Sequence, residues 1–89
     1  MKTYVVTFES HSDASREKVA ERLKTYGYYC PIHNYCWAIM TEKTAMEIVT
    51  YLKEVINSGE RLFVVRSGTE GAWVNIYGEK NSEWLKKNL

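Results

Sequence analysis

YYCPIHNYCWAIMT, residues 28–41, decides the fold of this chain. It holds two strand-forming runs that are expected to turn near His33-Asn34. Pro31 has no N–H to donate to a neighbouring strand, so the first run belongs at the edge of a sheet. The second run, Tyr35 to Met40, is almost wholly apolar, which is typical of a strand buried on both faces. The stretch therefore predicts a β-hairpin with one edge strand and one central strand.

The chain before the hairpin predicts a strand followed by a helix. Residues 2–9 alternate between two faces, and residues 14–26 place apolar side chains at helical spacing with charged side chains between them. Asp13 is expected to be the N-cap of this helix, and Gly27 is expected to end it. The strand finishes on an acid, Glu9.

The chain after the hairpin predicts a second helix and a third stretch of sheet. Thr44-Ala45-Met46-Glu47 matches a capping box, and the helix that it opens is expected to end before Asn57-Ser58-Gly59. Residues 61–66, RLFVVR, predict a strand, and the alternating residues 72–77 predict a short last strand. Asn81 or Ser82 then caps a closing helical turn or two.

This order, strand-helix-strand-strand-helix-strand, predicts an α+β fold of the ferredoxin-like type. In that fold an antiparallel sheet in the order 4-1-3-2 carries both helices on one face. The Pro31 strand then lies at an edge and the Tyr35–Met40 strand lies in the centre. With 89 residues, we expect a single domain over residues 1–89, because a chain of this length has room for one core.

The strand at residues 62–65, Leu-Phe-Val-Val, is apolar on both faces although the topology makes it the other edge. A bare apolar edge promotes aggregation, and the sheet face away from the helices also receives apolar side chains. Residues 72–77 can cover the edge, either within their own chain or by crossing to a neighbour. A two-fold dimer with facing sheets would cover the open face. We therefore expect a homodimer.

The composition argues against a strongly basic nucleic-acid-binding protein. The net charge is +1, so any phosphate-binding surface has to be a local patch. The apolar fraction of 45% is typical of a folded chain. No signal-peptide pattern and no apolar run of membrane-spanning length is present, so we expect a cytoplasmic protein without a membrane partner and with reduced cysteines.

The whole chain resembles the small CRISPR-associated proteins of spacer adaptation and their relative, virulence-associated protein D. The likeness rests on layout: TYVVTFE ends on an acid, a helix ends in TYG, an edge hairpin follows, and LFVVR precedes a short tail. The chain looks closer still to small, mostly uncharacterised bacterial proteins sometimes labelled SinR-like. These share the look of TYVVTFE, CWAIM, RLFVVRSGTEGAW and SEWLKKNL. The sequence shows no helix-turn-helix that would make it a transcription regulator.

The resemblance implies a ferredoxin-like homodimer associated with nucleic acid. In the CRISPR-associated family, an Asp at the end of the first strand of each subunit holds a divalent metal for phosphodiester cleavage, and Glu9 occupies that position here. Glu can bind Mg²⁺ or Mn²⁺ through oxygen, but it is one methylene longer than Asp and would shift a tightly placed metal. Other family members act only as scaffolds. Two functions stay open: a metal-dependent nuclease acting on RNA or DNA, and a non-catalytic homodimeric scaffold or protein-interaction module.

Glu9 and His11 are the candidate catalytic residues. Glu9 is the expected metal ligand, and His11 is the expected general acid or base. Two Glu9 carboxylates near a dimer axis would repel each other unless a cation or a proton lay between them. The alternative is a strand that ends in a solvated loop, because one acid and one histidine form no specific motif.

Two further groups of residues have a functional and a structural interpretation. Arg16, Arg22 and Lys24 offer a phosphate-binding face, although interleaved acids are more typical of a solvated helix. Cys30, His33 and Cys36 lack the close cysteine pairs and the fourth ligand of a zinc site, which favours small buried strand residues. A turn on His33-Asn34 would place Cys30 opposite Trp37, whereas a three-residue turn would bring the two cysteines face to face.

Overall fold

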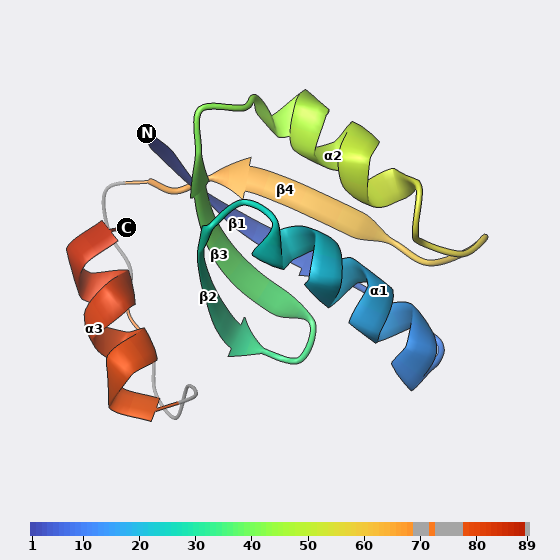
Figure 1. Cartoon of the computed structure of the whole chain (residues 1–89), viewed down its shortest axis with the longest axis horizontal. Coiled ribbons are helices and arrows are strands. Elements are labelled where there is room, and N and C mark those ends of the chain that lie inside the picture. The colour runs from blue at the N-terminus through green and yellow to red at the C-terminus, as the bar shows by residue number, and fades with distance from the viewer. Residues whose placement is uncertain (69–71, 73–77, 89) are drawn as a thin grey trace.

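A four-stranded antiparallel sheet forms the centre of the protein in a computed structural model, which describes residues 1–68, 72 and 78–88 (Figure 1). The strands are β1 (Lys2–Phe8), β2 (Tyr28–His33), β3 (Cys36–Thr41) and β4 (Leu62–Arg66), and the sheet order is β2-β3-β1-β4. The Pro31 strand therefore lies at one edge, and the apolar β3 lies inside the sheet, as the sequence predicted. The fold is α+β, with three helices beside the sheet.

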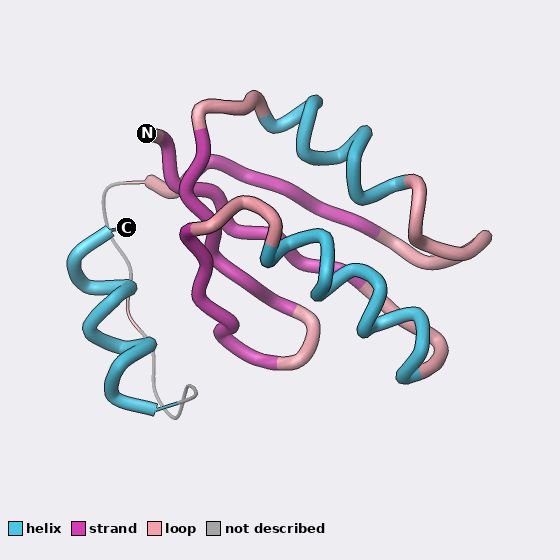
Figure 2. Tube along the Cα trace, viewed as in Figure 1, coloured by secondary structure: helices cyan, strands magenta, loops and turns pink. Residues whose placement is uncertain are grey.

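Two helices, α1 (Asp13–Lys24) and α2 (Ala45–Lys53), lie on one face of the sheet (Figures 1 and 2). This confirms the predicted helix layer. Each helix buries one apolar stripe against the alternating side chains of β1 and β3. The buried members of this core are Tyr4, Val6, Phe8, Val19, Leu23, Trp37, Ile39, Ile48 and Leu52.

The start of α2 has the predicted capping box. Thr44 Oγ1 accepts a hydrogen bond from the Glu47 N–H at 3.1 Å, and Glu47 Oε1 accepts one from the Thr44 N–H at 3.0 Å. Each side chain satisfies a backbone donor that the first turn of a helix leaves without a partner. The helix therefore begins where the sequence places it.

The start of α1 corrects the prediction by one residue. Ser12, in an extended conformation with φ −155°, is the N-cap, and its Oγ accepts a hydrogen bond from the Ser15 N–H at 3.1 Å. Asp13 is instead the first helical residue, with its carboxylate 3.6 Å from Arg16 Nη2. Serine and aspartate are both good N-caps and are adjacent here, so the sequence alone does not tell which of the two caps the helix. The helix ends at Lys24 with Thr25 as its C-cap, two residues before the predicted end at residue 26, and Gly27 follows with φ +83°.

The hairpin between β2 and β3 adopts neither of the registers considered from the sequence. Pro31 lies opposite Trp37 and His33 lies opposite Cys36, so Ile32 is an extra residue in a bulge beside the proline. The chain turns on Asn34-Tyr35. Cys30 lies opposite Ala38. The two cysteines therefore do not face each other across the hairpin.

A third helix, α3 (Gly78–Asn88), is longer than the predicted closing turn. Asn81 and Ser82 lie inside it and do not cap it, and Asn81 Nδ2 donates a hydrogen bond to the Pro31 carbonyl at 3.1 Å. Leu85 packs with Cys30 and Ala38, which lie on the sheet face opposite α1 and α2. Thus α3 covers part of the face that the sequence left open.

The other part of that face, over β1 and β4, keeps exposed apolar side chains. Phe63 is 60% exposed and Val65 is 44% exposed, and both lie on β4 at the edge of the sheet. The strand predicted for residues 72–77 lies outside the described residues except for Ala72, which is exposed. Within the described ranges, no helix has the length and apolar character needed to cross a membrane.

Candidate functional site at the end of strand β1

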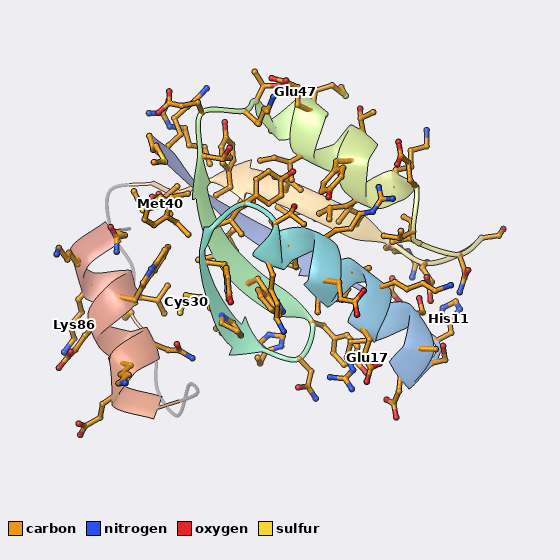
Figure 3. All side chains as sticks on the ribbon, viewed as in Figure 1. His11, Glu17, Cys30, Met40, Glu47 and Lys86 are labelled. Carbon is orange, nitrogen blue, oxygen red and sulfur yellow. The ribbon has the colours of Figure 1, made fainter. Side chains whose placement is uncertain are left out.

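The loop that follows β1 lies between the hairpin turn and the start of β4. The Phe8 N–H donates to the Tyr35 carbonyl at 2.9 Å, and the Glu9 N–H donates to the Arg61 carbonyl at 2.8 Å. These bonds extend the β1 ladder by one residue past its last strand position and fix the backbone of Glu9. Figure 3 shows His11 in this loop, beside the start of α1.

The Glu9 carboxylate forms an ion pair with Arg61. Arg61 Nη1 lies 2.8 Å from Glu9 Oε1, and the two side chains are 84% and 46% exposed respectively. The hydrogen bond that Arg61 donates to Glu9, together with the negative charge of Glu9, raises the pKa of the Arg61 guanidinium. The positive charge beside Glu9 therefore comes from Arg61 of the same chain.

His11 contributes its backbone to the site, and its imidazole is exposed. The His11 N–H donates to Glu60 Oε2 at 2.7 Å. Glu9 thus binds Arg61 while His11 binds Glu60. The geometry assigns the two predicted catalytic residues to different partners.

Glu60 is the residue of this site that the sequence did not reveal. It is only 7% exposed, and its carboxylate accepts hydrogen bonds from the Asn57 N–H at 2.6 Å and the His11 N–H at 2.7 Å. Ser15 Oγ donates to both of its oxygens, at 2.8 and 2.9 Å. The backbone N–H groups of Asn57 and then His11 are the main causes that lower the pKa of Glu60. One carboxylate therefore joins the β1–α1 loop, the first turn of α1 and the loop before β4.

Ser10, between the two predicted catalytic residues, has a buried hydroxyl. Its Oγ has no hydrogen-bond partner among the described residues. In the rest of this run, the His11 N–H donates to Glu60 Oε2 and the Ser12 hydroxyl accepts from the Ser15 N–H.

Two of the three cations predicted to bind phosphate on α1 make contacts within the protein. Arg22 Nη1 donates to the Tyr51 carbonyl at 2.7 Å and to Glu54 Oε1 at 2.5 Å, and its guanidinium lies 4.6 Å from the centre of the Tyr51 ring. Arg16 pairs with Asp13, as described above. Lys24 is exposed. Arg22 therefore fastens α1 to α2, and Lys24 is the most accessible of the three predicted cations.

The two cysteines are free thiols in separate environments. Cys30 is buried, and its Sγ lies 3.6 Å from the Asn81 carbonyl of α3. Burial raises the pKa of Cys30 to about 11 and also raises the pKa of Cys36. Among residues 1–68, 72 and 78–88, no group of three or more His, Cys, Asp and Glu side chains is placed to hold a metal. Cys30 is thus a packing residue under α3.

Two of the grooves on the described surface lie away from this loop. One, of about 710 Å³, runs between the end of α1 and α2, where Tyr26, Met46 and Tyr51 line it. The other, of about 440 Å³, lies between α3 and the β2–β3 hairpin, where Tyr28 and Trp84 line it. Neither groove includes Glu9 or His11.

Comparisons with known proteins bear on the fold alone. No protein-family model matches the sequence, and no curated protein matches it. A solved structure does match: the crystal structure of a hypothetical protein TT1823 from Thermus thermophilus, with a TM-score of 0.69 and 16% sequence identity. The match covers 84% of this chain and 92% of that chain. The architecture is therefore shared with a protein of similar extent, at an identity too low to transfer a function.

Proposed function

We propose that this protein is a homodimeric, non-catalytic binding module with a ferredoxin-like fold, related to the small CRISPR-associated and virulence-associated proteins that its sequence resembles. The fold name is supported by the strand order β2-β3-β1-β4 and by the two helices on one face, with α3 as an addition. The proposal makes the protein a scaffold that binds another macromolecule without changing it.

The observation that carries the non-catalytic part is the ion pair between Glu9 and Arg61, at 2.8 Å. A divalent metal prefers several oxygen ligands, and in the described residues the Glu9 carboxylate has the Arg61 guanidinium beside it. A nuclease of the family type needs this carboxylate free to receive the metal. In this chain the Glu9 carboxylate is instead paired with Arg61.

The homodimer is supported by the exposed apolar side chains of β4. A chain of 89 residues has a thin core and gains stability from association. Phe63 and Val65 lie exposed on an edge strand, where a second chain can bury them. A second copy of this chain is the partner that is always present at the same concentration.

A second function, a nuclease dependent on Mg²⁺ or Mn²⁺, is favoured by one observation. The Glu9 carboxylate is 46% exposed at the end of β1, where the resemblance places the metal-binding acid. An exposed ion pair stabilises a protein by only about 0–1 kcal/mol, so a metal that binds Glu9 would lose little free energy by displacing Arg61. RNA or DNA would be the substrate.

A cleavage panel separates the two functions. Single- and double-stranded RNA and DNA are incubated with Mg²⁺ or Mn²⁺ and the native protein, Glu9→Ala, Arg61→Ala or Glu17→Ala, the last being an exposed acid on α1 that serves as a matched control. The scaffold proposal expects no metal-dependent cleavage by the native protein or by Arg61→Ala. Cleavage by the native protein that disappears in Glu9→Ala and persists in Glu17→Ala would establish the nuclease instead.

A further inference from the structure

We propose that β4 pairs antiparallel with β4 of a second copy, so that two four-stranded sheets join into one continuous sheet across a two-fold axis at Val64. This inference rests on the proposed homodimer and specifies its interface. The surface is the free edge of β4, which in the described residues has β1 on one side and no strand on the other.

The backbone of β4 determines which groups are free. The hydrogen bonds from Glu9 N–H to the Arg61 carbonyl, at 2.8 Å, and from Ser67 N–H to the Thr3 carbonyl, at 2.9 Å, lie at the two ends of the β1–β4 ladder. In an antiparallel ladder, hydrogen-bonded positions alternate, so Phe63 and Val65 also direct their N–H and C=O groups to β1. Leu62, Val64 and Arg66 direct theirs to the free edge. These groups can pair with a strand of another chain.

The side chains of β4 are complementary to a second β4 in this register. With the axis at Val64, Leu62 faces Arg66 of the second copy, and Phe63 faces Val65 of the second copy. An aromatic side chain opposite a β-branched one stabilises a strand pair, and the same contact occurs twice because the interface is two-fold symmetric. The two most exposed apolar side chains of the strand thus cover each other.

Charge disfavours one shifted register. An axis at Arg66 would place two arginines directly opposite each other, which destabilises a strand pair. An axis at Leu62 would pair β4 with residues before the strand, including the buried Glu60. The axis at Val64 uses the whole length of the strand and leaves each arginine opposite an uncharged side chain.

The position of α3 favours an edge contact over facing sheets. Through Leu85, α3 packs on the open face against Cys30 and Ala38 of the β2–β3 hairpin. A second sheet laid on that face would meet this helix. The free edge of β4 lies at the opposite end of the sheet order from β2, so strand pairing leaves α3 in place.

Disulfide trapping tests the register. In a Cys36→Ser background, Phe63→Cys and Val65→Cys proteins are made separately, checked for native circular dichroism, and oxidised alone or as a mixture. Directly opposed cysteines in an antiparallel pair lie within disulfide reach, whereas diagonal ones do not, so we expect roughly tenfold more covalent dimer in the mixture than in either protein alone. Native protein is measured in parallel by size-exclusion chromatography with light scattering.

Each outcome has a different meaning. A native dimer together with the mixed disulfide supports the interface. A native dimer without the mixed disulfide overturns the β4 pairing about Val64 but leaves the proposed homodimer intact, and it indicates that another register, segment or face holds the copies together. A native monomer at micromolar concentration overturns both.

Discussion

Glu60 is a charged residue in an interior position, stabilised by neutral donors. Two backbone N–H groups and one hydroxyl bind its carboxylate, and no Lys or Arg pairs with it in the described part of the chain. Hydrogen bonds to the charged form favour ionisation, which is why the pKa of Glu60 falls below its ordinary value of 4.5. The residue therefore stabilises the fold only while it is ionised.

This gives a pH-dependent prediction for Glu60→Gln. Because the folded-state pKa is lowered, the stabilisation is fully present above about pH 4.5 and is lost as the pH falls through the folded-state value. Urea unfolding at pH 7 is expected to show the variant clearly less stable than the native protein, with the gap closing as the pH falls below about 4.5. Glu17→Gln, a change at an exposed acid, should show no such gap. A gap independent of pH would refute the role of the charge.

The sequence could predict residue roles where the interaction is local, and it failed where the partners are distant. Thr44 and Glu47 bind each other across one helical turn, so their spacing alone predicts the capping box. Glu60 binds Ser15, 45 positions away, and an acid in the turn-forming run NSGER is normally solvated. The same holds for Glu9, whose position was predictable but whose partner Arg61 lies 52 positions away.

At the scale of the helix, the α2 cap predicts the effect of Thr44→Ala. The change removes the oxygen that accepts from the Glu47 N–H, and loss of an N-cap side chain destabilises a protein by about 1 kcal/mol. Urea unfolding measures this difference. Thr50→Ala is the matched control, because its hydroxyl donates to the Met46 carbonyl within the helix and leaves no backbone group without a partner, so under about 0.5 kcal/mol is expected. Equal losses in the two variants would refute the capping role.

The packing of α3 predicts a linked change in stability and thiol reactivity. Leu85 is 1% exposed over Cys30, so Leu85→Ala should destabilise the protein by about 2 kcal/mol or more. The change should also speed alkylation of Cys30, which burial and a pKa of about 11 keep unreactive at pH 8 in the native protein. Mass spectrometry after iodoacetamide treatment reports the modified residue. Lys86→Ala, at an exposed neighbour, should change neither quantity, and unaltered Cys30 alkylation in Leu85→Ala would contradict this packing.

The boundaries of helices and strands were predictable where neighbouring residues in the sequence determine them, and not where tertiary contacts do. The proline of β2 predicted an edge strand, and the structure has it there, but the bulge at Ile32 depends on how the proline fits against β3. The length of α3 was not predictable, because its anchoring contacts are Leu85 with the sheet and Asn81 with the Pro31 carbonyl. Polar sequence such as GEKNSEW gives little helical signal without those contacts.

For the whole molecule, the sheet order was predicted from the order of the elements, read as a ferredoxin-like fold, and the apolar patterns agreed with it. The central position of β3 follows from its apolar run, and the helix layer follows from the stripes on α1 and α2. The sequence led us to expect that a partner chain covers the second face of the sheet. In the structure α3 covers part of that face through Leu85, and this contact could not be predicted from the sequence.

The proposed homodimer predicts that thermal stability depends on protein concentration. If folding and association are coupled, the midpoint of unfolding should rise by roughly 5 °C or more over a hundredfold increase in concentration, by mass action. Circular dichroism at micromolar and higher concentrations measures the midpoint. A midpoint that stays constant over this range would indicate a monomer.

The hydrogen bond from Thr3 Oγ1 to the Asn88 carbonyl, at 2.6 Å, joins positions 85 residues apart. Figure 1 shows the two chain ends close together beside α3. Glu9 follows β1 at the far end of that strand, about 20 Å away at the rise of an extended chain. Tethering the protein to a surface or a fusion partner through either end would therefore hold it in the same orientation, with the Glu9 loop directed outward.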